Sequence, residues 1–241
     1  MSTETTPLDL QAPLRNVWYH VAPSRRLKAG QMAGRVVVRE PIVFGRTHDG
    51  KVFALRDICP HRAVPLSFGR FDGKEIACHF HGWRFSPAGR CVAIPTLVEG
   101  QNLDISGIGT RAYQVRESHG NIWVWIGEPR DRFPNPPAIP EIGDTPVRLD
   151  FSMDFPCAAE NALVAFFDPA HTVHVHTSWW YRSSRPAHEK EKRYSPLPDG
   201  IRMDRAASKA NGLAYRMLGG GVSTEILFHL PSIRIEHVKA G

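Results

Sequence analysis

Four residues of the types that bind iron or zinc occur as two short pairs in the first half of the chain. Cys59 and His61 are separated by one residue, Cys78 and His81 by two, and sixteen residues lie between the pairs. Proline or glycine flanks both pairs, so we expect each pair on a loop at the end of a strand. Two such loops, each providing one thiolate and one imidazole, could place two Cys on one iron and two His on the other iron of a [2Fe-2S] cluster.

A mononuclear zinc site is the alternative use of the same four side chains. Zinc fingers usually pair like ligands, C-x(2–4)-C followed by H-x(3–5)-H, whereas both pairs here mix Cys with His. The mixed pairs favour the cluster, in which two neutral imidazoles replace two thiolates and raise the reduction potential. His79 lies between the ligands of the second pair and is interpreted as their neighbour.

A second group of metal-binding residue types is Asp168, His171 and His176, with the spacing D-x-x-H-x(4)-H. Two His and one carboxylate hold non-haem Fe(II) in proteins and leave positions open for dioxygen and substrate. On a continuous helix the two histidines would lie about 140° apart, so the backbone must break between them if both bind one metal. Pro169 and the β-branched residues that follow favour such a break. A polar turn without metal is the alternative interpretation.

The elements around the first four residues are expected to be antiparallel strands. Pro41 separates the first two β-branched runs, and residues 47–50 form a turn into the next strand. Trp123 and Trp125 share one strand face, which predicts that they pack in the core. The expected strands are 36–40, 42–46, 51–56, 113–117 and 122–126.

Five prolines among residues 129–140 exclude a helix or a central strand and predict a stiff extended linker. Residues 1–130 carry 17 basic and 11 acidic side chains, whereas the remainder is electroneutral. We therefore expect a first domain at 1–130, a Pro-rich linker at 131–144 and a second domain at 145–241. The second domain is expected to have a strand at 147–155, a helix at 157–167, and strands at 202–206, 224–230 and 233–238.

Composition excludes several classes of function. The net charge is +6 over 241 residues, without a basic stripe interleaved with aromatic residues, so no nucleic-acid partner is expected. No run of 18 apolar residues occurs, and the first ten residues lack the features of a secretory signal, so neither a membrane span nor export is expected. A cytoplasmic location follows as an expectation, and four cysteines in a reducing compartment are poor evidence for disulfides.

The segments CPHRAVPLSFGRFDG and IACHFHGWRFSPAGRCVAIP, which contain the two pairs, resemble the Rieske domain of the ring-hydroxylating oxygenases. The opening LRNVWYHVAPSRRLKAG is similar to the entry segment of their oxygenase subunits. The resemblance implies an α+β chain: an N-terminal antiparallel β Rieske domain, then a partial catalytic domain with a helix on an antiparallel, helix-grip-like sheet. It also implies that Cys59, His61, Cys78 and His81 bind the [2Fe-2S] cluster.

The same resemblance implies roles for the second group. His171 and His176 would bind a mononuclear Fe(II), and Asp168 would link this iron to the cluster of an adjacent subunit in a homotrimer. The implied activity is that of a terminal oxygenase, which uses O2 to hydroxylate or demethylate an aromatic or other cyclic organic substrate. A ferredoxin or flavin reductase would supply the electrons, since the chain has no G-x-G-x-x-G dinucleotide loop. Arg25, Arg26 and Lys28 could contact such a partner.

The chain departs from the family at the third iron ligand. That ligand should be an Asp or Glu more than a hundred residues beyond the second His, but only 65 residues follow His176. Glu225 and Glu236 are the acids on the expected last strands, and no motif recommends either. Three interpretations remain: a chain truncated at its C-terminus, which the sequence favours, a partner that supplies the ligand, or a second domain that has lost its chemistry. The alternative function is a Rieske electron carrier whose second domain is inactive or incomplete.

Overall fold

The computed structural model describes residues 14–138, 151, 153, 155–168, 175, 192–209 and 221–240. The chain divides into two compact units, Met1–Ile139 and Pro140–Gly241, which are described separately. The division falls inside the segment predicted as the linker. In the described part of the chain, no helix is both long and apolar enough to cross a membrane.

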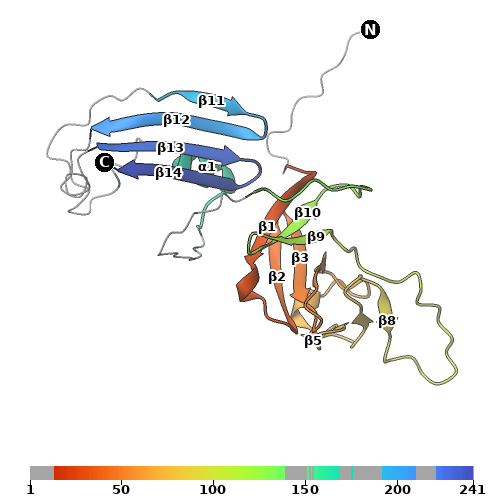
Figure 1. Cartoon of the computed structure of the whole chain (residues 1–241). Helices are drawn as coiled ribbons and strands as arrows, with labels where there is room; N and C mark the ends of the chain where they lie inside the picture. Colours follow the sequence, from red (N-terminus) through yellow and green to blue (C-terminus); the bar gives the residue numbers. More distant parts are fainter. Residues whose placement is uncertain are drawn as a thin grey trace, which may run out of the picture. The chain divides into compact units, whose positions relative to one another are not determined.

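The described residues of the first unit form three antiparallel sheets (Figure 1). Their strand orders are β1-β10-β9, β2-β3-β4 and β5-β6-β7-β8. The elements are β1 (Val17–Pro23), the 3-10 helix η1 (Ser24–Arg26), β2 (Gln31–Val37), β3 (Glu40–Arg46), β4 (Val52–Arg56), the 3-10 helix η2 (Leu66–Phe68), β5 (Arg70–Phe71), β6 (Ile76–Ala77), β7 (Arg84–Phe85), β8 (Cys91–Ala93), β9 (Val115–Ser118) and β10 (Asn121–Ile126).

The prediction that Pro41 separates two strands is wrong. The turn between β2 and β3 is formed by Val38 and Arg39, whose φ angles are 44° and 67°. Val37 pairs with Glu40 next to this two-residue turn, and Pro41 pairs with Val36 inside the ladder. In such a hairpin the pair beside the turn exchanges the hydrogen bonds and the next pair does not, so proline removes no bond to β2.

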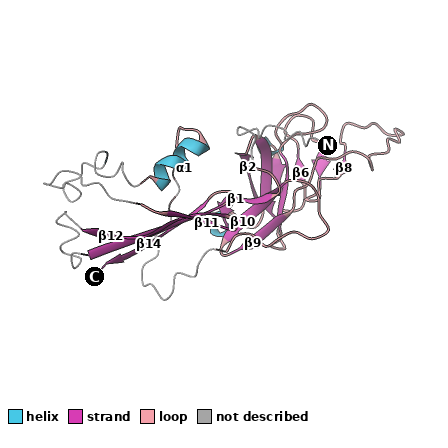
Figure 2. Cartoon of the chain, turned by 90° about the horizontal axis from the view of Figure 1, so that it is seen from above, coloured by secondary structure: helices cyan, strands magenta, loops and turns pink. Residues whose placement is uncertain are grey.

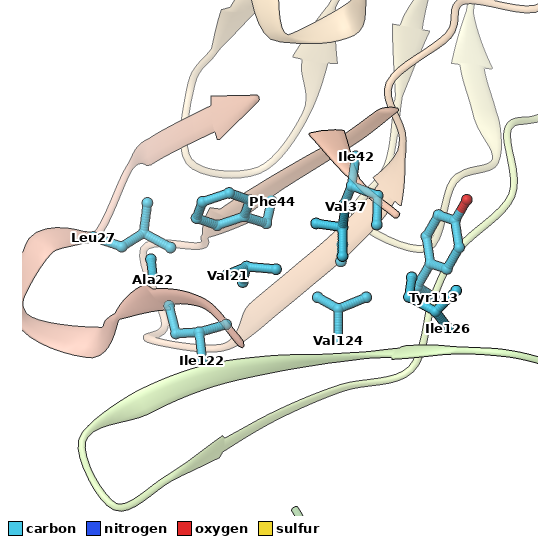
Figure 3. Close-up of a cluster of buried hydrophobic side chains, with 11 residues drawn as sticks. Val21, Ala22, Leu27, Val37, Ile42, Phe44, Tyr113, Ile122, Val124 and Ile126 are labelled. Atoms are coloured by element: carbon cyan, nitrogen blue, oxygen red, sulfur yellow. The ribbon is translucent and has the colours of Figure 1, made fainter. Parts of the chain in front are cut away.

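The main core of the first unit lies between the β1-β10-β9 and β2-β3-β4 sheets. Figure 3 shows apolar side chains from both sheets directed toward one another, among them Val21, Phe44 and Val124. Alternate residues of β10 point the other way, which places Trp123 and Trp125 on the opposite face at 1% and 3% exposure. The prediction that both tryptophans are buried is confirmed.

The first part of the predicted linker packs on this opposite face. The Phe133 ring lies 5.4 Å from that of Trp125 and 6.1 Å from that of Trp18, measured between centroids. Trp18 Nε1 donates to the Pro134 carbonyl at 2.9 Å, and Pro136 is buried. Residues 133–136 are therefore attached to the first unit by ring contacts and a hydrogen bond.

The second unit has a helix beside one face of a four-stranded antiparallel sheet (Figure 2). Its elements are α1 (Ala159–Phe167), β11 (Tyr194–Leu197), β12 (Gly200–Lys209), β13 (Gly221–His229) and β14 (Ile233–Ala240), in the sheet order β11-β12-β13-β14. The Phe167 ring faces Phe228 of β13 at 6.4 Å, and Arg234 of β14 donates to the Phe166 carbonyl at 2.9 Å. These contacts join the end of the helix to the sheet.

The α+β class and the helix-plus-sheet arrangement are confirmed, with differences at the ends of elements. The helix begins at Ala159, two residues later than expected, and β11 is an additional strand. The strand expected at 147–155 does not appear in its described residues, because Phe151, Met153 and Phe155 are exposed and belong to no strand. Alternation of apolar residues there does not reflect a buried face.

Candidate iron–sulfur centre

The first ligand loop, residues 59–64, is closed by two backbone hydrogen bonds. The amide of Cys59 donates to the carbonyl of Val64, and the amide of Ala63 donates to the carbonyl of Cys59, both at 2.9 Å. Ala63 has a φ of 56°, in the left-handed region that L-residues seldom adopt. The chain thus reverses sharply around His61.

The second ligand loop, residues 78–83, repeats this conformation. The amide of Cys78 donates to the carbonyl of Trp83 at 2.8 Å, and the amide of Gly82 donates to the carbonyl of Cys78 at 3.0 Å. Gly82 has a φ of 71° and stands where Ala63 stands in the first loop. Each loop therefore begins at a Cys, closes on the fifth residue after it, and turns at a left-handed residue.

Short strands of the first unit bring the two loops together. The first loop follows β4 and leads through η2 into β5, while the second connects β6 to β7. Because β5 pairs with β6 and β6 pairs with β7, the exit of the first loop lies beside the entrance of the second. Gly69 makes this approach possible, since a Cβ at that position would overlap the carbonyl oxygen of Ala77.

All four predicted cluster ligands line one small hollow. Cys59 and Cys78 are buried at 2% and 4% exposure, whereas His61 and His81 are half-buried. The two imidazole rings lie 4.6 Å apart between centroids. The structure therefore has a buried thiol side and a more exposed imidazole side.

Burial affects the protonation of Cys59 and His61. Burial raises the pKa of the Cys59 thiol, the nearby Cys78 raises it further, and the backbone amides of His61 and Arg62 act in the opposite direction. Burial, with help from His81 and Arg62, lowers the pKa of His61 and favours the neutral imidazole that binds metals. Nδ1 of His81 is buried without a hydrogen-bond partner among the described residues, as expected for an atom reserved for a ligand.

A cluster and a single zinc ion require different sets of protein ligands. Within the described part of the chain, no three His, Cys, Asp or Glu side chains surround one point as a single metal ion requires. A binuclear cluster needs only two protein ligands for each iron, because its sulfides supply the others. The donor set, the hollow and the unpartnered His81 nitrogen fit a [2Fe-2S] cluster.

The second predicted metal-binding group is only partly described. Asp168 is the exposed C-cap residue of α1, and its amide donates to the carbonyl of Val164 at 2.9 Å. His171 and His176 lie outside the described residues. Glu225 and Glu236 lie on β13 and β14, where Glu225 accepts a hydrogen bond from Arg205 at 3.3 Å and Glu236 pairs with Arg234.

Sequence reasoning missed two residues that surround the ligand loops. Trp83 stacks on His61 with a centroid separation of 4.6 Å and an interplanar angle of 4°, so a residue of the second loop covers a ligand of the first. Asp57, two residues before Cys59, is buried at 7% exposure and accepts hydrogen bonds from Ser67. A single acidic residue two positions before a predicted ligand pair is a sequence signal that could have pointed to Asp57. No local sequence pattern predicts the stacking of Trp83 on His61.

Residues 17–114 match the family described as Rieske [2Fe-2S] domain. The fold, the paired Cys/His loops and this match define the first unit as a Rieske [2Fe-2S] domain. The chain is 36% identical over 130 residues to the oxygenase component of dicamba O-demethylase from Stenotrophomonas maltophilia, covering 54% of this chain and 37% of that protein. It is 35% identical over 116 residues to an iron–sulfur subunit of the toluene-4-sulfonate monooxygenase system from Comamonas testosteroni, covering 48% and 32%.

A solved structure of dicamba monooxygenase bound to 3,6-dichlorosalicylic acid matches 94% of this chain and 68% of its own, with a TM-score of 0.71 and 25% identity. Residues 17–114 are thus a Rieske-type domain, and the similarity in fold to dicamba monooxygenase extends beyond them. The matched sequence spans about a third of the length of the two curated relatives.

Proposed function

We propose that the chain is the terminal oxygenase component of a Rieske-type oxygenase system. The observation that carries this proposal is the convergence of two Cys/His loops on one hollow. The similarity in fold to dicamba monooxygenase over 94% of the chain supports a role beyond electron carriage. The substrate would be an aromatic or other cyclic organic molecule that is hydroxylated or demethylated with O2.

In this proposal Cys59 and Cys78 hold one iron of the cluster, and His61 and His81 hold the other. The bound cluster accepts and passes on one electron at a time. The buried thiols keep water from their side of the cluster, whereas the half-buried imidazoles bring the other side near the surface. Electrons would therefore enter and leave on the imidazole side.

His171 and His176 would bind the mononuclear Fe(II), which supplies dioxygen activation when it is bound. Asp168 would connect this iron to the cluster of an adjacent subunit in a homotrimer. Its place supports that role, because the end of α1 holds its backbone and its side chain is exposed. A carboxylate at this position could accept hydrogen bonds from two imidazoles, one on each side.

A ferredoxin or flavin reductase would donate the electrons. Arg25, Arg26 and Lys28 are exposed on and after η1, while Leu27 between them is buried and anchors the segment. Exposed positive charge on a rigid turn can steer an acidic redox partner. Charge reversal at Lys28 is therefore expected to slow reduction of the cluster and to weaken its dependence on salt.

The test uses the full chain reconstituted with iron and sulfide under anaerobic conditions. Wild-type protein should show the electron paramagnetic resonance signal of a reduced Rieske cluster and three irons per chain. Combined His171→Ala and His176→Ala should remove one iron and leave the cluster signal unchanged. Combined His48→Ala and His119→Ala, at two exposed histidines in turns of the first unit, is the matched control and should keep all three irons.

Two irons per chain in both the wild type and the double variant would overturn the oxygenase proposal. That outcome would favour the alternative function, a Rieske electron carrier with an inactive or incomplete second domain. A colourless protein with one bound zinc and no acid-labile sulfide would overturn the cluster assignment itself.

A further inference from the structure

Asp57 is the buried charged side chain of the described part of the chain, and it lies beside the first ligand loop. One carboxylate oxygen accepts a hydrogen bond from the Ser67 amide at 2.7 Å, and the other accepts one from the Ser67 hydroxyl at 2.5 Å. Each carboxylate oxygen therefore has one hydrogen-bond donor from Ser67. We call these two hydrogen bonds the Asp57–Ser67 clasp.

The clasp joins the two ends of the segment that carries Cys59 and His61. Asp57 follows β4 directly, and Ser67 is the middle residue of η2, so the whole first ligand loop lies between them. The amide of Asp57 also donates to the carbonyl of Pro41 at 2.9 Å, which ties the clasp to β3. The loop is therefore held by a charged side chain that is itself fixed to a sheet.

Strand β2 packs against the clasp at Gly34. A Cβ on Gly34 would lie 2.6 Å from the Ser67 hydroxyl oxygen and 3.0 Å from a carboxylate oxygen of Asp57. The absence of a side chain at this position lets the strand cover the carboxylate. The burial of Asp57 is thus built by three elements, namely the end of β4, η2 and β2.

Both hydrogen bonds to Asp57 come from a neutral residue, so neither brings a compensating positive charge. Burying a carboxylate in this way costs free energy of desolvation, and an amide of the same shape would cost less. A fixed negative charge in a region of low dielectric opposes the arrival of an electron nearby. Its effect on the cluster is opposite to that of the two neutral imidazoles.

We infer that Asp57 is a positioning residue that closes the first ligand loop through Ser67 and, by its buried negative charge, lowers the midpoint potential of the cluster. This inference rests on the proposed assignment of Cys59 and His61 as ligands. It does not depend on the mononuclear iron or on the identity of the substrate.

The test is a redox titration of the reconstituted full chain, followed by electron paramagnetic resonance. Asp57→Asn keeps the shape and removes the charge, so the equilibrium constant for reduction of the cluster should increase at least threefold. This corresponds to a midpoint potential about 28 mV higher, at 59 mV per decade for one electron. Asp49→Asn, the same change at an exposed hairpin, is the matched control and should leave the potential unchanged.

Ser67→Ala separates charge from loop closure. It keeps the carboxylate and removes one donor, so iron loss to a chelator should be at least threefold faster, with a potential no higher than that of the wild type. A loop that was merely loosened would move the potentials of the Asp57 and Ser67 variants in the same direction.

An unchanged potential in Asp57→Asn overturns the inference, as does a higher potential in Ser67→Ala. If Asp57→Asn fails to fold, the Ser67→Ala variant still tests the inference. A midpoint potential and a rate of iron loss that both equal the wild-type values would overturn it. Absence of the Rieske signal from the wild-type chain would instead overturn the ligand assignment.

Discussion

The two ligand loops have the same backbone hydrogen bonds but are held in place by different means. A buried clasp between Asp57 and Ser67 holds the first loop. The second loop connects two paired strands, and the partly exposed ion pair between Glu75 and Arg84 reinforces them at 2.6 Å. The comparison shows that one ligand geometry can be built from a buried charge or from a short hairpin.

The loops also differ at the residue that reverses the chain. The first places Ala63 in the left-handed region, which costs an L-residue roughly 1–2 kcal/mol, whereas the second uses Gly82 at little cost. The first loop is therefore the more strained of the two, and it is also the one with the buried support. Four predictions test this comparison, beginning with the largest effect.

Removal of either thiol should abolish the cluster, because the loops contribute equally to it. We expect Cys59→Ala and Cys78→Ala to lose all acid-labile sulfide and visible absorption after reconstitution. Cys91→Ala is the matched control, since Cys91 is buried in the same apolar cluster but is not a predicted ligand. Retention of the cluster in either loop variant, or its loss in the control, would contradict the assignment.

Gly69→Ala should damage both loops at once, because it acts where they meet. The new methyl group would overlap the Ala77 carbonyl and lie 3.0 Å from the carbonyl oxygen of Leu66. Overpacking of this kind costs about 1–3 kcal/mol, which should lower the urea midpoint of unfolding of the first unit. Gly107→Ala, where a Cβ meets nothing within 4 Å, should leave that midpoint nearly unchanged.

Single substitutions at the two left-handed residues, Gly82→Ala and Ala63→Gly, should affect stability differently. Gly82→Ala should destabilise by about 1 kcal/mol from backbone strain alone, since its Cβ would meet Pro95 at an ordinary 3.6 Å. Ala63→Gly should relieve the same strain and leave stability equal or up to about 1 kcal/mol higher. The urea midpoints of the two variants measure the difference, and a loss of stability in Ala63→Gly would show that Ala63 is not strained.

The smallest effect is expected at Asp72, in the turn before β6. The amides of Glu75 and Lys74 hold the pKa of its carboxyl below the ordinary value. Its stabilising contribution is therefore present above the unfolded-state pKa of about 3.9 and is lost as pH falls through the lower folded-state pKa. Urea midpoints of Asp72→Asn and wild type should differ slightly at pH 7 and converge toward pH 3. A constant difference would exclude the carboxylate charge as its cause.

Local pattern predicted the strands around the loops because β-branched alternation and turn residues act over a few positions. The strand at 122–126 and the burial of Trp123 and Trp125 are confirmed. The error at Pro41 arose because local pattern does not show strand pairing. Only the pairing of β2 with β3 shows that the N–H that proline lacks is not needed there. The proline-rich composition likewise did not predict the ring contact between Phe133 and Trp18.

The sequence by itself predicted which side chains bind the cluster, because ligand type and spacing are properties of the covalent chain. Only the tertiary structure decided that Cys59 and Cys78 share a hollow, that Trp83 stacks on His61, and that Asp57 is buried beneath Ser67. These contacts join loops on different strands. Their geometry depends on sheet register and on close approaches at glycine, which short-range sequence patterns do not encode.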